Sequence, residues 1–334
     1  MNKVFINGTA AKYGGGSTIL ESYLESKIDD DANYYYVFCP FKPQKLPLHC
    51  KWVKYSTDGL STLFFSLFLS FFIALYFRCT KVISFSNLNC IFSAPSISKI
   101  TYFHNMLILN GEGFKFKILR LISKYGLQSK NLYIFQTTYV KEQFLKSMGF
   151  LPSCKVRWPG VSVQYLDDKS HYQQTYDAKA PFKLLVPIMD LTQSHKNFSL
   201  IKEFASHSYN NELEFYITST NLDVDFSKDH NSKLRYLGNL SKQQFINAID
   251  KCDGVIIVSE TETLCLPIFE ALVRGKPVFV LDKPYVKGLE DQFGLIYGLH
   301  KFYDFDNLVS KIEQSLVSTE VYFREEYLKG NWDF

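Results

Sequence analysis

Short apolar runs rich in β-branched residues alternate along the chain with longer segments of helical periodicity. Two such runs, residues 255–258 and 278–281, have the length of buried parallel strands and enclose one helix-length segment. The ends of that segment are marked, because Pro267 suits the first helical position and Gly275 suits the left-handed residue just past a helix end. The pattern predicts a β-α-β unit whose helix runs from Pro267 to Arg274.

The same alternation extends over the whole chain and predicts an α/β fold with parallel sheets. Further strands are predicted at residues 3–7, 34–38, 52–53, 81–85, 100–105, 132–137, 155–161, 184–187, 214–218 and 234–237. Residues 282–298 continue the alternation, and the last helices are expected to start at Asp306 and to end near Trp332. A chain of 334 residues with 46% hydrophobic content is too long for one ordinary core, so we expect two domains joined by the polar residues 167–180.

Residues 60–77 form an apolar segment of Leu and Phe without charge, at the lower limit of a membrane span. A strand is expected directly after it, so a span would put two strands of one sheet on opposite sides of the membrane. Small residues recur within it at four-residue spacing, at Thr62, Ser66, Ser70 and Ala74. This stripe predicts a helix packed closely onto the sheet or a neighbouring helix. Its Phe-rich remainder is expected in the core, with contact to a membrane interface as the alternative.

Charge is unevenly distributed. The formal net charge is +4, but residues 1–160 carry 19 Lys and Arg against 8 Asp and Glu, whereas residues 161–334 carry 18 against 25. A basic first half indicates contact with an anionic membrane surface. Nucleic acid is not expected as a partner, because the basic residues match no nucleic-acid-binding motif. The seven cysteines include no C-x-x-C pair and the N-terminus lacks a signal-peptide core, which fits a reduced cytoplasm.

Candidate chemistry lies between the first strand of the β-α-β unit and its helix. This loop, residues 259–266, is expected at the carboxyl end of a strand, where open α/β sheets bind ligands. Glu262 lies in the loop and Glu270 in the first helical turn, with seven residues between them. Free N–H groups at a helix start attract anionic oxygens, and a nearby carboxylate accepts hydrogen bonds from paired hydroxyls. A sugar nucleotide offers both groups, whereas the alternative makes both acids solvated surface residues.

The segment E-T-L-C-L-P-I-F-E, residues 262–270, resembles the E-x7-E signature of glycosyltransferase family 4, whose usual form is E-G-F-G-L-P-x-x-E. Members of that family are retaining enzymes of GT-B fold. Thr263 and Cys265 stand at the two glycine positions, while the Leu266-Pro267 corner and both acids are kept.

The resemblance assigns roles to this segment. It implies that Glu270 holds the ribose and that Glu262 contacts the hydroxyls of the transferred sugar. Backbone N–H groups would meet the phosphates from a donor-binding loop made of Thr263, Leu264, Cys265 and Leu266.

Other stretches match the same family. Gly14, Gly15 and Gly16 follow the first strand, ahead of a helix expected to be capped by Ser17, and resemble the acceptor-side loop that faces the donor phosphates. His104 closes a strand where family members have a histidine that reaches the donor sugar, although a lone histidine there is commonly structural.

The second half carries two more matches. Lys196 lies at an expected helix start, in S-H-K-N, where the resemblance implies that it holds the donor diphosphate. Family members have an Arg some residues earlier, and this chain has none, so Lys196 as a solvated surface lysine is the alternative. Gly238 and Asn239 follow a strand where the family counterpart passes close to the base.

Taken together, the resemblance implies two Rossmann-like domains with parallel sheets facing across a cleft, the GT-B fold. Residues 1–163 would form the acceptor-binding, membrane-facing domain and residues 164–334 the nucleotide-sugar-binding domain, with the last helix returning to the first. QTTYVKEQF, with a helix capped by Thr137 or Thr138, would lie on the acceptor side.

The implied activity is transfer of a hexose-type sugar, with retention, from a nucleotide donor to a lipid-linked glycan in surface polysaccharide biosynthesis, such as O-antigen or capsule. The sequence shows no acidic metal cluster such as Asp-x-Asp at the end of a predicted strand, so no metal or other cofactor is expected. The enzyme would be peripheral on the inner face of the cytoplasmic membrane, held by a basic helix with Lys115, Lys117, Arg120 and Lys124. Two rivals remain: a GT-B sugar-nucleotide epimerase and a non-catalytic GT-B scaffold.

Overall fold

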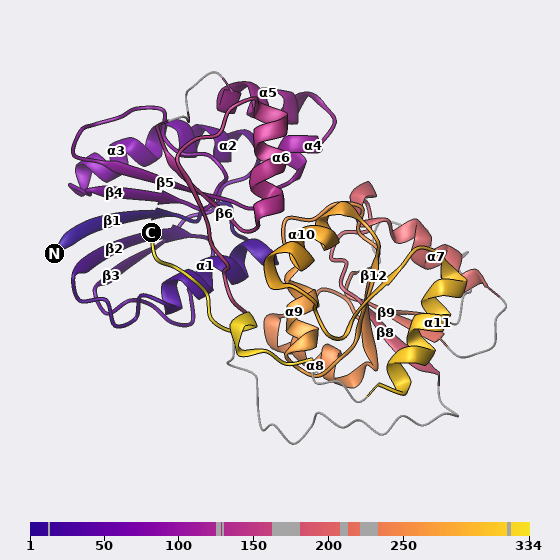
Figure 1. Ribbon diagram of the computed structural model, residues 1–334. Coiled ribbons are helices and arrows are strands. Elements are labelled where there is room, and N and C mark those ends of the chain that lie inside the picture. Colours follow the sequence, from indigo (N-terminus) through magenta and orange to yellow (C-terminus); the bar gives the residue numbers. More distant parts are fainter. Residues whose placement is uncertain are drawn as a thin grey trace. The chain divides into compact units, whose positions relative to one another are not determined.

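The computed structural model describes residues 1–12, 14–124, 128, 130–161, 181–207, 213–220, 233–318 and 322–334. The chain forms two compact units (Figure 1). The first holds Met1–Gly160 together with Lys329–Phe334, and the second holds Val161–Leu328. The expected linker at residues 167–180 and the expected boundary after residue 163 lie outside the described residues.

The first unit is built on seven parallel strands in the order β3-β2-β1-β4-β5-β6-β7. Its strands are β1 (Asn2–Asn7), β2 (Asn33–Cys39), β3 (Cys50–Lys54), β4 (Lys81–Ser84), β5 (Ser98–Phe103), β6 (Leu132–Phe135) and β7 (Cys154–Val156). The strand order reverses at β1, which pairs with both β2 and β4. Ligand crevices of open α/β sheets form outside the carboxyl ends of strands at such points.

Helices cover both faces of this sheet. They are α1 (Gly15–Glu25), α2 (Gly59–Phe64), α3 (Ser70–Tyr76), α4 (Leu107–Asn110), α5 (Phe114–Ile122) and α6 (Thr138–Met148). In Figure 1, α2 to α6 lie on one side of the strands and α1 lies on the other. Thr137 caps α6 as predicted, with its side chain accepting from the Val140 N–H at 3.2 Å. The prediction for Ser17 is wrong: it lies inside α1, which follows Gly14 (φ 68°), and its hydroxyl donates to the Gly14 carbonyl.

The apolar segment 60–77 forms one helical rod between β3 and β4. A π-helical turn, η1 (Phe65–Leu69), joins α2 to α3. The small-residue stripe faces inward as predicted, with Ser66, Ser70 and Ala74 buried. Among the described residues, Gly59–Tyr76 is the one helix long and apolar enough to cross a membrane, yet only 28% of it is buried. The expectation of a largely buried helix is therefore wrong.

The chain ends on the first unit. Trp332 is buried and packs against Tyr23 of α1 and Tyr102 of β5, with ring centroids 5.5 and 5.7 Å apart. Phe334 stacks on the same Tyr23 ring, and the Lys27 ammonium donates to the Trp332 carbonyl. A terminal helix was expected here, but residues 328–334 are non-helical and the last helical turn is the short 3-10 segment η6 (Glu325–Tyr327). The return therefore rests on aromatic packing of a non-helical segment.

The second unit has six parallel strands in the order β10-β9-β8-β11-β12-β13. They are β8 (Phe182–Val186), β9 (Leu213–Ile217), β10 (Leu234–Tyr236), β11 (Gly254–Ile257), β12 (Val278–Leu281) and β13 (Leu299–Phe302). The alternation expected over residues 282–298 extends slightly further along the chain, since the last strand, β13, starts at Leu299. This sheet reverses at β8, so the carboxyl ends of β8 and β11 form its switch point.

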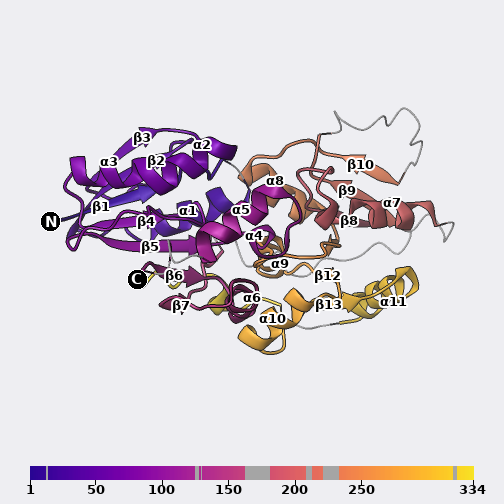
Figure 2. The ribbon, with the colours of Figure 1, turned by 90° about the horizontal axis from the view of Figure 1, so that it is seen from above.

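The helices of the second unit are α7 (Phe198–Ser206), α8 (Lys242–Lys251), α9 (Leu266–Leu272), α10 (Pro284–Phe293) and α11 (Phe305–Leu316). Figures 1 and 2 show α7 and α11 along one face of the strands and α8, α9 and α10 along the other. The core under α7 and α11 is continuous, because buried residues such as Ile201 and Leu308 pack with Phe215 and Ile256 of the sheet.

Candidate functional site

The loop after β11 leads into α9 through an unusual backbone conformation. Cys265 precedes the helix with φ 54° and ψ 66°, in the left-handed region that favours glycine. This is one of the two positions where the family pattern has Gly. The left-handed backbone conformation explains why glycine suits this position. The helix starts at Leu266 and ends at Leu272, so it lies slightly earlier than predicted and places Glu270 in the second turn rather than the first.

Lys196 and Glu262 meet at the switch point of the second sheet. Lys196 ends the 3-10 turn η4 (Ser194–Lys196) after β8, and its Nζ lies 2.6 Å from Glu262 Oε1 in the loop after β11. Both side chains are mostly covered, with 24% and 16% exposure. Burial opposes the charge of the ammonium, but Glu262 outweighs it, so the pKa of Lys196 is raised and the side chain stays cationic. The interpretation of Lys196 as a solvated surface lysine is therefore wrong.

Glu270 has a cationic partner that the sequence did not single out. Its carboxylate is buried, and Oε1 forms an ion pair with Nζ of Lys242, the first residue of α8. Lys242 follows Gly238 and Asn239 by only a few residues, so the chain connects that turn directly to Glu270. The S-x-x-Q capping box of Ser241 fixes the start of α8, and this signal is readable in the sequence. The sequence does not show, however, that Lys242 would pair with the carboxylate of Glu270.

A third ion pair holds the same loop. Glu260 Oε2 lies 2.6 Å from Lys283 Nζ, and Glu260 Oε1 accepts from the Asn197 amide at 3.0 Å. The Glu260 backbone N–H donates to the His195 carbonyl at 2.8 Å. These bonds tie the loop after β11 to the turn that carries Lys196. Sequence reasoning missed both Glu260 and Lys283.

The two acid–lysine pairs lie close to each other around Cys265. The Cys265 thiol is influenced by Glu262, Lys196 and Glu270, and burial followed by the nearby acids holds its pKa well above the ordinary value. The thiol therefore stays protonated. Leu264 and Leu266 are buried beside it and anchor the loop. The structure thus brings Glu262, Glu270, Lys196 and the stretch from Thr263 to Leu266 together, as predicted.

The turn after β10 is also built as expected. Gly238 has φ 77°, and its N–H donates to the Ser219 carbonyl at 3.1 Å. Asn239 is exposed beside it. Both residues lie at the carboxyl edge of the sheet, two strands away from β8.

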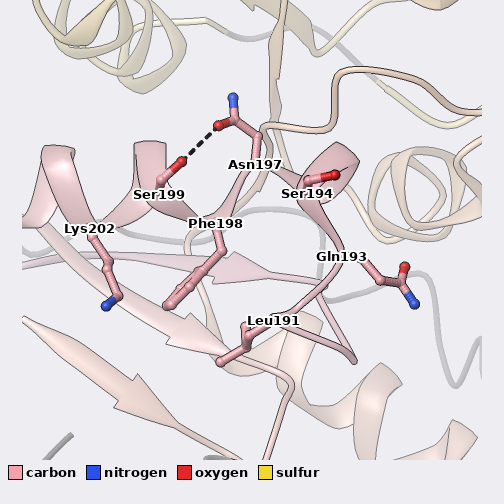
Figure 3. A pocket seen from close by; sticks show the side chains of 7 residues that line it. All are labelled: Leu191, Gln193, Ser194, Asn197, Phe198, Ser199 and Lys202. Carbon is pink, nitrogen blue, oxygen red and sulfur yellow. Dashed lines mark hydrogen bonds between the residues drawn. The ribbon is translucent and has the colours of Figure 1, made fainter. Parts of the chain in front are cut away.

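A shallow pocket of about 270 Å³ adjoins the Lys196 turn. It is lined by Leu191, Gln193, Ser194, Asn197, Phe198, Ser199 and Lys202. Figure 3 shows Phe198 and Leu191 side by side, with Asn197 bonded to Ser199 above them. None of the predicted site residues lines this pocket, so it is a neighbour of the charged cluster rather than its centre.

The first unit brings two predicted residues together. A Cβ on Gly16 would lie 3.6 Å from His104 Nε2, so the glycine-rich turn after β1 and the residue after β5 are neighbours. The His104 backbone N–H donates to Asn87 Oδ1 at 2.7 Å. Burial lowers the pKa of His104 to about 4, which keeps its imidazole neutral near pH 7. A Cβ added at Gly15 would meet no atom of another part of the chain within 4 Å.

No protein-family model and no curated protein sequence matches the chain. Solved structures do resemble it. HepE from Anabaena, in complex with UDP and glucose, is 14% identical with a TM-score of 0.66, over 96% of this chain and 92% of that one. WaaG, a glycosyltransferase involved in lipopolysaccharide biosynthesis, is 11% identical with a TM-score of 0.63, over 95% and 91%. UDP-GlcNAc 2-epimerase from Methanocaldococcus jannaschii is 11% identical with a TM-score of 0.56, over 98% and 96%.

These likenesses concern the fold. Both units have a sheet of parallel strands with helices on both faces, and the structures that share this arrangement span nearly the whole chain. The predicted α/β fold of GT-B type is confirmed.

Proposed function

We propose that the chain is a glycosyltransferase whose second unit binds a nucleotide sugar. The observation that carries the proposal is the pairing of Lys196 with Glu262 and of Lys242 with Glu270 around Cys265, at the carboxyl edge where open α/β sheets bind ligands. By contrast, the ion pair of Lys287 with Asp291 on the same unit is exposed. The two pairs at the switch point are largely covered. Burying charged groups costs desolvation free energy, so their burial favours a role in binding or specificity.

Lys196 is proposed to hold the donor diphosphate. An ammonium has three donors, and one of them is taken by Glu262 at 2.6 Å, which leaves others for phosphate oxygens. Glu262 fixes the position of the lysine and keeps its second oxygen for a sugar hydroxyl. The absent Arg leaves Lys196 as the charge that stabilises the departing diphosphate, and we propose that no metal is needed.

Glu270 is proposed to hold the ribose. Its carboxylate is buried and is paired with the ammonium of Lys242, so it is not left as an isolated charge in the interior. An ionised carboxylate can accept two hydroxyl donors at once, as a ribose diol presents. Gly238 and Asn239, which lead into Lys242, are proposed to contact the base.

Beyond donor binding, the proposal extends to the stereochemistry of transfer, the acceptor and the location of the enzyme. We propose transfer of a hexose-type sugar with retention, onto a lipid-linked glycan in surface polysaccharide biosynthesis, on the inner face of the cytoplasmic membrane. The E-x7-E resemblance, the fold shared with WaaG and the basic first 160 residues support this assignment. His104, neutral and next to Gly16, is proposed to donate or accept a hydrogen bond rather than to supply charge.

Two other functions remain as candidates. The fold shared with a UDP-GlcNAc 2-epimerase supports a sugar-nucleotide epimerase, and the missing Arg supports a scaffold without activity. Titration calorimetry with UDP, GDP, dTDP and ADP tests nucleotide binding first. A sugar nucleotide that carries the base bound most tightly is then incubated with the protein, with and without a detergent-dispersed lipid-diphosphate glycan as acceptor. Sugar found on the lipid supports the proposal, an isomeric donor formed without acceptor indicates the epimerase, and no nucleotide binding indicates the scaffold.

A further inference from the structure

A row of large apolar side chains stands on the solvent side of the rod formed by α2, η1 and α3. The row, here called the outer ridge, consists of Leu60, Phe64, Phe68, Phe72 and Tyr76. Leu60 and Tyr76 are each 81% exposed, and Phe64 and Phe72 are each 55% exposed. Phe64 contacts Phe68 with ring centroids at 5.5 Å, and Phe68 and Phe72 both contact Phe92 of the loop after β4, at 6.1 and 5.7 Å. The three phenylalanines of the ridge thus form one aromatic surface with Phe92.

The π turn keeps this surface in line. In a regular α-helix, residues four apart drift by about 40° per step, so a row of five would wind about 160° around the rod. The π-helical turn at Phe65–Leu69 winds less per residue and reverses part of that drift. The stripe of Ser66, Ser70 and Ala74, two positions out of step, is thereby kept facing the sheet while the outer ridge stays on the opposite side.

The charges around the ridge fit an anionic lipid surface. Residues 60–77 carry no ionisable group except Tyr76, as a layer that enters the bilayer interface requires. Cations border the end of the rod: Lys51 Nζ lies 5.7 Å from the Phe77 ring centroid, and Arg78 is exposed directly after it. At the other end, Asp58 is paired with Lys12.

The same face of the first unit carries a second basic, apolar element. Figure 1 places α5 on the side of the strands that α2 and α3 cover. On α5, Phe114 and Leu121 are exposed together with Lys115 and Lys117. Crossing the membrane is excluded, because the rod connects β3 and β4 of one hydrogen-bonded sheet.

We propose that the outer ridge inserts into the interface of an anionic bilayer and seats the first unit on it. Phe and Tyr side chains are favoured at that depth, and the flanking cations attract the anionic headgroups. The inference deepens the proposed function, since it rests on a lipid-linked acceptor, but its test does not require transfer activity.

The first experiment measures binding of the full chain to vesicles of phosphatidylcholine with about one third phosphatidylglycerol. We expect F64S/F72S to weaken co-sedimentation by about tenfold or more, the effect of removing two aromatic contacts with lipid. The matched control is L316S, which removes an exposed apolar side chain, 42% exposed, from α11 of the second unit. Equal binding of F64S/F72S and wild type would overturn the proposal.

A second experiment reports insertion directly. F72W should gain a blue-shifted emission with these vesicles and be quenched by brominated lipid, whereas L316W should show neither. Each signal is measured as the difference from wild type. Unquenched F72W, or a ridge-dependent dimer in ultracentrifugation without lipid, would instead assign the ridge to protein contact. Vesicle binding without sugar transfer would contradict the proposed function alone, and transfer without vesicle binding would contradict this inference alone.

Discussion

Cys265 shows how one backbone position links the family pattern to stability. Its φ of 54° is strained for any side chain and free of strain for glycine. We expect C265G to be more stable than C265A by about 1 kcal/mol, because both lose the thiol but only Gly relieves the left-handed strain. Urea unfolding of the two variants measures the difference. Equal stabilities would mean that the loop relaxes once the thiol is gone.

Lys196 is the residue on which the proposed chemistry depends most. We expect K196A to lower kcat by about 100-fold or more, the scale of losing one charge-stabilising donor. K287A is the matched control, because it removes an exposed ion-paired lysine from the same unit. Steady-state kinetics with saturating donor checks this. A kcat for K196A within a few-fold of that of K287A would remove Lys196 from the mechanism.

His104 should make folding stability depend on pH. Its folded pKa is lowered to about 4 by burial, against an ordinary value near 6.5. As the pH falls below 6.5, His104 becomes protonated in the unfolded chain but stays neutral in the folded chain until about pH 4. The free energy of unfolding therefore decreases between pH 6.5 and pH 4. H104N should therefore lose less stability between pH 7 and pH 5 than wild type in urea titrations. An unchanged pH dependence would show that the imidazole is solvated.

At the scale of elements, the basic residues on and just after α5 differ in their contacts: one is held within the fold and the others face solvent. The Arg120 guanidinium donates to the carbonyls of Ile108, Leu109 and Gly111, so it terminates α4 and its predicted role in a lipid-facing patch is not favoured by its contacts. Lys115, Lys117 and Lys124 are exposed.

This difference gives opposite expectations. K115Q/K117Q/K124Q should bind anionic vesicles about 100-fold more weakly at low salt with an unchanged melting temperature, since juxtamembrane cations contribute about 1 kcal/mol each. R120Q should instead lower the melting temperature, because three carbonyls lose a charged donor. Co-sedimentation and thermal unfolding measure the two effects. The reverse pattern would place Arg120 at the lipid and the lysines in the fold.

On the scale of the whole molecule, the chain closes the first unit with its own end. Trp332 is 5% exposed and lies against Tyr23 and Tyr102. We expect W332A to destabilise the first unit by about 3–5 kcal/mol, the range for large-to-small changes in a core. Nucleotide affinity of the second unit, measured by calorimetry below the unfolding temperature, should stay unchanged. A stability loss below 1 kcal/mol would show that the segment is only loosely attached.

Local physics explains what the sequence determined. Strands, helix ends and special backbone positions follow from periodicity and capping within a few residues, which is why the β-α-β unit, the Thr137 cap and the left-handed Gly275 (φ 69°) were predictable. The acids Glu262 and Glu270 were found in the same way, from a spacing along a single loop and helix.

Only the tertiary structure decided the partners and the uncovered surfaces. Lys242 meets Glu270 from 28 residues away, and Lys196 meets Glu262 from 66 residues away, because the strand order brings separate carboxyl ends to one edge. The exposure of the outer ridge likewise depends on what packs over it, and composition made the same residues look like core. Contacts between distant segments are set by how strands order in a sheet, and no local pattern in the chain encodes that order.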